Sequence, residues 1–227
     1  MAWTRHVLER PSAWNTAVGH ELWTQEEPPA TTLAILLPGD RYRRDAPLLD
    51  YARQVCLQHG CDVLAVEYGH QAARSDLGPQ GTERVAAESA AAVRDALQPQ
   101  YRRLVVVAKS LGTRVAAHAA HMAPIWDERP TVFAFLTPLV PVVPFMRTRG
   151  GLIIVGDQDP AFGPEALRAV RATGGLDVRV LAGADHQLLI RDHWRASLAA
   201  LEATCAGLED LLAGRSNRSV DAGTQGT

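Results

Sequence analysis

The segment Val105-Val106-Val107-Ala108-Lys109-Ser110-Leu111-Gly112 contains the decisive signal for the fold of this chain. Its apolar run, residues 104–108, predicts a strand that is covered on both faces, as in a parallel sheet. Residues 111–122 then predict a helix. A serine on so tight a strand-to-helix turn projects its hydroxyl beyond the carboxyl end of the sheet. Ser110 is therefore a candidate nucleophile, and a plain helix N-cap is the structural alternative.

The same alternation of apolar runs and helical patterns extends along the chain in both directions. Strands are predicted within 18–23 and at 31–37, 62–66, 131–136, 151–155 and 178–181, and helices at 45–59, 82–97, 164–173 and 191–212. This alternation indicates a three-layer α/β/α domain with a mostly parallel sheet. We expect residues 1–213 to form that single domain and the small, polar residues 214–227 to form a disordered tail.

Composition excludes several classes of function. The chain has 227 residues, 47% of them apolar, and a formal net charge of -2. We therefore expect no nucleic-acid partner and no anionic membrane partner. Its apolar runs are far shorter than the roughly 20 residues of a spanning helix. The first 30 residues lack the apolar core of a signal peptide. Three cysteines in no metal-binding pattern, at positions 56, 61 and 205, predict reduced thiols and a cytoplasmic location.

Motifs for common cofactors and metals are missing from the sequence. Lys109-Ser110 is not preceded by the glycines of a phosphate-binding P-loop. His118 and His121 have no matching third ligand for zinc. No glycine-rich turn of the kind that binds a nicotinamide follows an early strand. We therefore expect neither a cofactor nor a metal.

A serine nucleophile needs a base, and the base needs an orienting acid. Ligands of parallel sheets bind at the carboxyl ends of the strands, so the residues that follow each strand are the candidates. His186 lies just beyond the last predicted strand, whereas its competitor His193 falls at the start of the final helix. Asp157 and Asp159 both follow the preceding strand. Either one can orient a histidine, and either can also be an ordinary turn residue.

Four short segments together resemble the α/β-hydrolase superfamily, in particular its small, uncapped dienelactone-hydrolase-like and esterase-like members. They are Leu37-Pro38-Gly39-Asp40, Ala108-Lys109-Ser110-Leu111-Gly112, Gly156-Asp157-Gln158-Asp159-Pro160 and Gly183-Ala184-Asp185-His186. The resemblance covers about residues 31–206 and departs from the usual G-x-S-x-G at Ala108. It implies the chain order nucleophile, acid, histidine. Because the family's acid usually closes a G-x-x-D pattern, the resemblance favours Asp159 over Asp157.

The resemblance also implies where the oxyanion hole lies. One backbone N–H comes from Leu111, and the other comes from the loop at Gly39 and Asp40. A carboxylate at Asp40 would oppose a developing anion unless it points away or pairs with a nearby arginine. Those arginines are Arg41, Arg43 and Arg44. They could also attract an acidic substrate, or form a solvated surface loop.

Residues 138–150 leave no room for a helical cap, so we expect a shallow, open site. Its predicted walls are Tyr42, Tyr68, Leu139 and Val140, which suit an acyl or aryl group, although such a patch can also bind a partner protein. The hypothesis is a serine hydrolase that cleaves an ester, thioester or related acyl bond of a small molecule. The alternative is a non-catalytic binding or scaffold protein of the same fold. Substrate identity and oligomeric state stay open.

The only lysine of the chain, Lys109, directly precedes Ser110. An arginine-biased composition explains the scarcity of lysine, and a role beside Ser110 is the functional interpretation.

Overall fold

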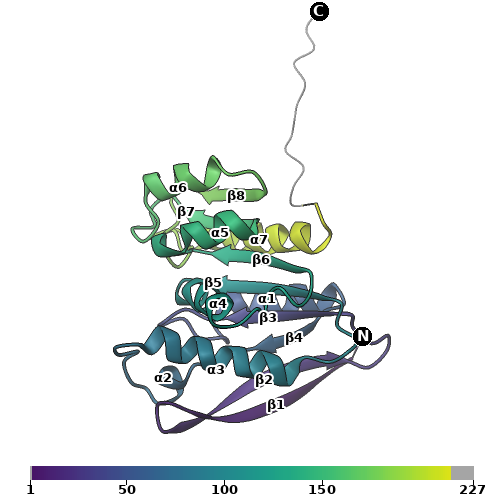
Figure 1. Ribbon diagram of the computed structural model, residues 1–227. Coiled ribbons are helices and arrows are strands. Elements are labelled where there is room, and N and C mark those ends of the chain that lie inside the picture. Colours follow the sequence, from purple (N-terminus) through teal and green to yellow (C-terminus); the bar gives the residue numbers. More distant parts are fainter. Residues whose placement is uncertain (1, 216–227) are drawn as a thin grey trace, which may run out of the picture.

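A computed structural model describes residues 2–215, and most of the predicted tail, residues 216–227, lies outside the described residues. One eight-stranded sheet, in the order β1-β2-β4-β3-β5-β6-β7-β8, runs through this part of the chain (Figure 1). The strands are β1 (Trp3–Ser12), β2 (Thr16–Gln25), β3 (Thr32–Leu37), β4 (Asp62–Ala65), β5 (Arg103–Lys109), β6 (Thr131–Leu136), β7 (Gly151–Gly156) and β8 (Leu176–Leu181). From β4 to β8 neighbouring strands are parallel, and β1 and β2 add an antiparallel hairpin at one edge.

Helices cover both faces of the sheet, which gives the predicted three layers. They are α1 (Pro47–Gln58), α2 (Gly69–Ala72), α3 (Gly81–Ala96), α4 (Leu111–Met122), α5 (Val143–Arg149), α6 (Pro164–Arg171) and α7 (Trp194–Leu212), with a 3-10 turn at Val140–Val142. Helices α1 and α7 pack on one face, and α3 to α6 pack on the other (Figure 1). Successive residues of β3 enter opposite layers, because Leu33, Ile35 and Leu37 join one cluster while Ala34 and Leu36 join the other. That two-sided burial is the physical cause of the uninterrupted apolar runs.

Two parts of the fold differ from the sequence-based expectation. Strand β1 was not predicted, because this edge strand is mostly exposed and its charged residues Arg5, Glu9 and Arg10 interrupt any apolar period. It nevertheless pairs with β2 along its whole length. Residues 138–150 contain the 3-10 turn and α5, which buries Met146 against the sheet. The segment therefore covers the sheet and forms no cap.

Over residues 2–215, no helix combines the length and the apolar character that crossing a bilayer needs.

Gly112 allows the central strands and α4 to pack closely. A Cβ atom placed on Gly112 would lie 2.2 Å from the carbonyl oxygen of Leu37 and 2.9 Å from that of Pro38. Both obstacles are backbone atoms of the neighbouring strand end, so they cannot rotate away. The second glycine of the serine motif is therefore required by packing between β3 and α4.

We expect Gly112→Ala to lower the free energy of unfolding by about 2 kcal/mol or more, because overpacking against backbone must shift a strand or a helix. Denaturant unfolding measures the change. Gly174→Ala is the matched control, since an added Cβ there meets nothing within 4 Å. Equal stability of the two variants would contradict this account of the turn.

Candidate active site

Ser110 forms the whole connection between β5 and α4. Its backbone angles, φ 50° and ψ -112°, fall where a side chain is strained. Three hydrogen bonds hold it there: its N–H donates to the Leu136 carbonyl at 3.0 Å, and its carbonyl accepts from the Thr113 N–H at 2.9 Å and the Thr113 hydroxyl at 2.7 Å. The Ser110 hydroxyl makes no capping hydrogen bond to α4. The N-cap alternative is therefore not what the structure has.

The Ser110 hydroxyl instead faces an imidazole. Its Oγ lies 2.8 Å from Nε2 of His186, and Nδ1 of the same ring lies 2.9 and 2.8 Å from the two carboxylate oxygens of Asp159. The Asp159 side chain is fully buried, and its Oδ1 also accepts the N–H of Ala161 at 2.8 Å. Residues from three strand ends thus form one continuous hydrogen-bonded chain. Such a chain can pass the hydroxyl proton to the ring while the carboxylate stabilises the resulting imidazolium.

The two competing candidates lie elsewhere. Asp157 Oδ1 accepts the N–H of Gly183 at 2.7 Å and thereby ties the turn after β7 to the loop that carries His186. His193 is exposed, immediately before α7.

The loop that carries His186 is held on both sides. A Cβ atom on Gly156 would lie 1.9 Å from the Ala184 carbonyl oxygen, so glycine is needed where β7 meets this loop. Asp185 Oδ1 accepts the N–H groups of Gln187 at 2.7 Å and Leu189 at 3.0 Å. The imidazole therefore projects from a loop whose backbone is already ordered.

The loop after β3, where the oxyanion hole was expected, is also tightly held. The N–H of Gly39 donates to the Tyr42 carbonyl at 3.0 Å, so Gly39 itself is engaged and the expectation that it supplies a donor needs correction. Among residues 2–215, the N–H of Asp40 meets no acceptor. Leu111 is the first residue of α4, where backbone N–H groups lack intrahelical partners. The N–H groups of Asp40 and Leu111 thus have no acceptor among residues 2–215.

Helix α2 clamps this loop through two neighbouring side chains. Gln71 Nε2 donates to the carbonyls of Gly39 at 2.7 Å and Asp40 at 2.8 Å. His70, which is buried, places Nε2 3.1 Å from Asp40 Oδ1. The Asp40 carboxylate is thus paired with a histidine.

Two of the three arginines of this loop pair with carboxylates other than Asp40. Arg43 pairs with Asp45, and Arg44 pairs with Glu21 and Glu67.

One cavity lies at Ser110, and a second cavity adjoins it. The first, of about 270 Å³, is lined by Gly39, Asp40, Arg41, Tyr42, Lys109, Ser110, His186 and Gln187. The second, of about 240 Å³, is mainly apolar and is lined by Tyr42, Pro47, Leu48, Gln187, Leu188, Leu189, Ser197, Leu198 and Leu201. Tyr42 and Gln187 belong to both, so a ligand at Ser110 has an apolar neighbour space between α1 and α7.

Three of the four predicted wall residues are not among those lining either cavity. Tyr68 is buried in the core beside His70, Leu139 packs against the core, and Val140 is exposed at the 3-10 turn. Only Tyr42 lies where expected. The wall comes instead from α1, α7 and the loop after His186, which sequence spacing could not place together.

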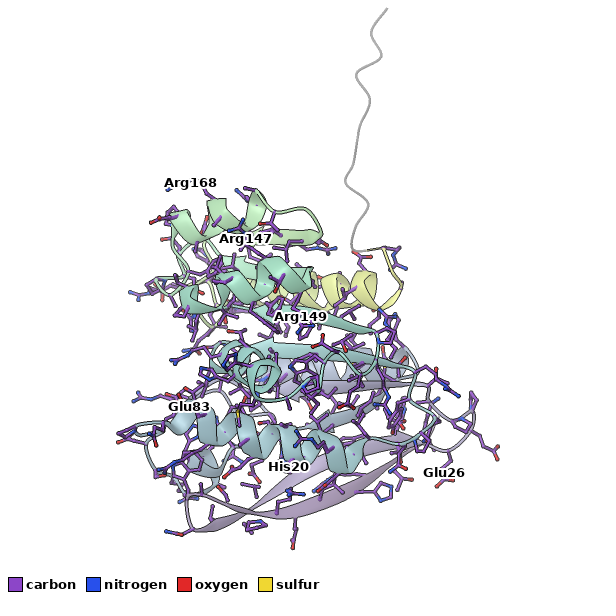
Figure 2. The ribbon with its side chains drawn as sticks, in the orientation of Figure 1. His20, Glu26, Glu83, Arg147, Arg149 and Arg168 are labelled. Carbon is purple, nitrogen blue, oxygen red and sulfur yellow. The ribbon has the colours of Figure 1, made fainter. Side chains whose placement is uncertain are left out.

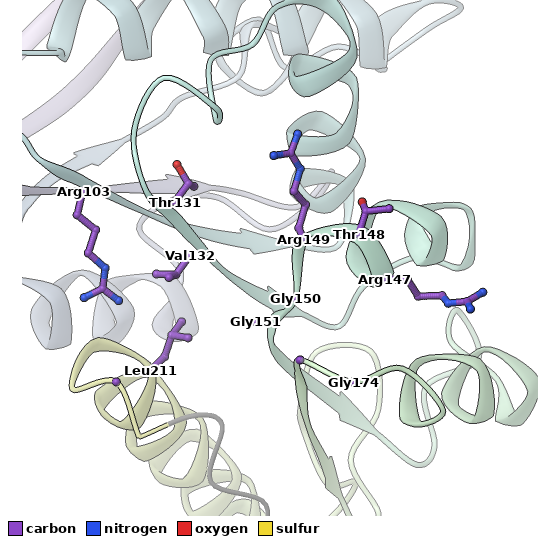
Figure 3. A pocket seen from close by; sticks show the side chains of 12 residues that line it. Arg103, Thr131, Val132, Arg147, Thr148, Arg149, Gly150, Gly151, Gly174 and Leu211 are labelled. Carbon is purple, nitrogen blue, oxygen red and sulfur yellow. The ribbon is translucent and has the colours of Figure 1, made fainter.

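Other polar features lie outside this cluster. His20 on β2, labelled in Figure 2, is fully buried, and burial lowers its pKa to about 4, so it stays neutral. A cavity of about 430 Å³ with three arginines, Arg103, Arg147 and Arg149, lies at the opposite ends of the strands. Their guanidinium groups point in different directions (Figure 3), so they form no shared anion site. Within residues 2–215, no three His, Cys, Asp or Glu side chains are grouped to share a metal ion.

Comparisons with known proteins identify the fold. No family model and no curated sequence matches the chain. Among solved structures, a provisionally assigned α/β hydrolase of unknown function from Agrobacterium tumefaciens is 16% identical with a TM-score of 0.66, over 92% of this chain and 96% of that one. An α/β serine hydrolase without a lid from Xanthomonas campestris is 16% identical with a TM-score of 0.60, over 95% and 96%. Est1E from Butyrivibrio proteoclasticus, solved with ferulic acid, is 15% identical with a TM-score of 0.64, over 87% and 95%. The chain therefore has the α/β-hydrolase fold, in its uncapped form.

The strain at Ser110 predicts a gain in stability when its side chain is removed completely. We expect Ser110→Gly to be about 1 kcal/mol more stable than Ser110→Ala, because glycine adopts a positive φ without a Cβ clash. Both variants lack the hydroxyl, so the difference between their free energies of unfolding in denaturant reports the backbone strain alone. A more stable alanine variant would show that the turn is unstrained.

Proposed function

We propose that this protein is a serine hydrolase that cleaves an ester, thioester or related acyl bond of a small molecule. The observation that carries the proposal is the hydrogen-bonded chain Ser110–His186–Asp159, with 2.8 Å at each end of the imidazole. The esterases and hydrolases among the structural neighbours agree with it. The alternative, a non-catalytic scaffold, would not need a strained serine and a buried carboxylate aligned on one imidazole.

In this proposal His186 takes the hydroxyl proton while Ser110 Oγ attacks the acyl carbon. The Nδ1–H of the ring donates to Asp159, which holds the required tautomer and stabilises the imidazolium. His186 then donates the proton to the leaving alcohol or thiol. Water, activated by the same ring, releases the acyl group from Ser110 and restores the hydroxyl.

The negative charge that develops on the acyl oxygen needs fixed donors. The N–H groups of Leu111 and Asp40 are the donors we assign. The contacts from His70 and Gln71 hold the Asp40 peptide and turn its carboxylate toward a partner of its own. A carboxylate held at His70 supports this assignment, because one aimed at the acyl oxygen would oppose the developing charge.

The adjoining apolar cavity would receive the hydrophobic part of the substrate. Its lining by Leu48, Leu198 and Leu201 suits an alkyl or aryl group, since binding there removes apolar surface from water. With no cap over residues 138–150, substrates would enter from an open surface.

We place this activity in the cytoplasm. The three cysteines are all free, and burial raises the pKa values of Cys56 and Cys61, which makes both thiols unreactive.

The assignment of the acid can be tested with matched variants. We expect Asp159→Asn to lower kcat for p-nitrophenyl esters by roughly ten-thousand-fold, because an amide cannot stabilise the imidazolium. Asp157→Asn should lower it less than about tenfold, since its amide oxygen can still accept the Gly183 N–H.

The nucleophile is tested with a fluorophosphonate probe, which should label the wild type and should not label Ser110→Ala. Labelling of the alanine variant at the wild-type rate would reject Ser110. A folded wild type that neither labels nor hydrolyses esters would favour the scaffold alternative.

Because the adjoining cavity is apolar, we expect the enzyme to prefer longer acyl chains. A charged side chain introduced into the cavity should abolish that preference. We expect Leu198→Asp to lower kcat/KM for an octanoate ester by roughly 5–30-fold, and that for an acetate ester much less, because a carboxylate beside the chain costs about 1–2 kcal/mol. Ala199→Asp adds the same charge at the next exposed position, outside the lining. If each variant changes kcat/KM for the octanoate and the acetate ester by the same factor, the cavity does not bind the acyl chain.

A further inference from the structure

The single lysine of the chain lies where few lysines are found. Lys109 is the residue before the nucleophile, and its side chain is only 1% exposed. Burying an ammonium group is costly unless it is fully paired. All other Lys or Arg positions of the chain hold arginine, and the one lysine is buried beside Ser110.

The ammonium group of Lys109 has three partners. Nζ donates to the Thr137 hydroxyl at 3.0 Å and to the backbone carbonyl of His186 at 3.1 Å, and it lies 4.7 Å from the centre of the Tyr42 ring. An ammonium has three N–H donors, and an aromatic face attracts a cation. The three partners thus match the protonated form of the side chain. A neutral amine would keep two donors and turn a lone pair toward one of these groups.

These contacts lie at the points where the backbone is strained. Ser110, Thr137 and Leu188 all have positive φ, of 50°, 43° and 59°. For a β-branched, fully buried residue such as Thr137 this is a genuine outlier that needs support from its surroundings. Lys109 directly precedes Ser110 and donates a hydrogen bond to Thr137. Its other hydrogen bond goes to the carbonyl of His186, two residues before Leu188.

We propose that the Lys109 ammonium is a positioning group that fixes the distance between nucleophile and base. Its backbone carries Ser110, and its side chain holds the main chain of His186, so one residue sets both ends of the 2.8 Å Oγ–Nε2 contact. The proposal rests on the serine-hydrolase function above and adds a residue that acts through the positions of Ser110 and His186 and transfers no proton.

The protonation state of Lys109 then sets an alkaline limit to activity. Burial lowers its pKa from 10.5 to about 8, against the opposing attraction of Asp159 and Asp185. Arg41, Asp40 and the imidazole of His186 line the same cavity, and Tyr42 stays neutral in this range because burial raises its pKa. Above about pH 8 the amine loses its proton and with it the contact to the Tyr42 ring.

The effect on stability has the opposite sign. The folded state binds this proton less tightly than the unfolded state, so the contribution of Lys109 to folding becomes more favourable as pH rises from about 8 toward 10.5. Loss of activity above pH 8 together with undiminished stability would therefore point to positioning and away from unfolding.

The test measures the rate at which a fluorophosphonate modifies Ser110, as a function of pH, with unfolding midpoints recorded in parallel. We expect the wild-type rate to fall above about pH 8. Lys109→Met should react at least tenfold more slowly at neutral pH and should lose the alkaline fall, while remaining folded. A wild-type rate and pH profile in folded Lys109→Met would overturn the proposal.

Thr137 offers a second pair of variants that leaves Lys109 in place. Thr137→Ser keeps the hydroxyl acceptor and should react at close to the wild-type rate, whereas Thr137→Val removes it and should slow the reaction severalfold. Equal rates for the two would also count against the proposal, even if Lys109→Met did not fold. Failure of the wild type to react with the probe at all would instead reject the proposed hydrolase function.

Discussion

The one-residue turn between β5 and α4 is the constraint on which the rest of this structure depends. Ser110 can face the cavity only because its backbone accepts an unfavourable φ and because Gly112 lets α4 lie against the end of β3. The backbone strain is held by packing on both faces of the central strands, where almost every side chain is fully buried. A rigid parallel sheet thus supports a strained residue at its carboxyl edge.

Order in the loops around the turn comes from side chains that hydrogen-bond to the loop backbone or to each other. Asp157 holds the Gly183 peptide, Asp159 holds the His186 ring, and Asp185 holds the backbone beyond it. On the other side, Gln71 and His70 hold the loop after β3. The site therefore requires little rearrangement for the proposed chemistry. In many enzymes, fixed donors and dipoles of this kind make the largest contribution to the rate enhancement.

Lys109 adds a buried charge to this arrangement at some cost to stability. Two carboxylates and an aromatic face offset the cost of its desolvation. Its donors reach the loops after β6 and β8, which are not hydrogen-bonded to each other within residues 2–215. Groups that stabilise a strained local geometry at the expense of the whole domain are typical of functional sites.

The sequence by itself determined the class of fold and the main polar candidates. Strands buried on both faces must be continuously apolar, so β3, β5, β6 and β7 could be recognised, and the residues directly after them had to lie along one edge. Edge strand β1 has no continuous apolar run because most of its residues are exposed to solvent.

Only the tertiary structure showed which of Asp157 and Asp159 contacts His186, because the two lie two residues apart in one turn and differ only in what their side chains meet. It also showed that residues other than Tyr68, Leu139 and Val140 line the cavities at Ser110. It revealed the hydrogen bond from the Lys109 ammonium to the His186 carbonyl. The physical reason is the same in each case. Periodicity reports whether a residue is buried, whereas contacts between loops depend on packing among segments far apart in the chain.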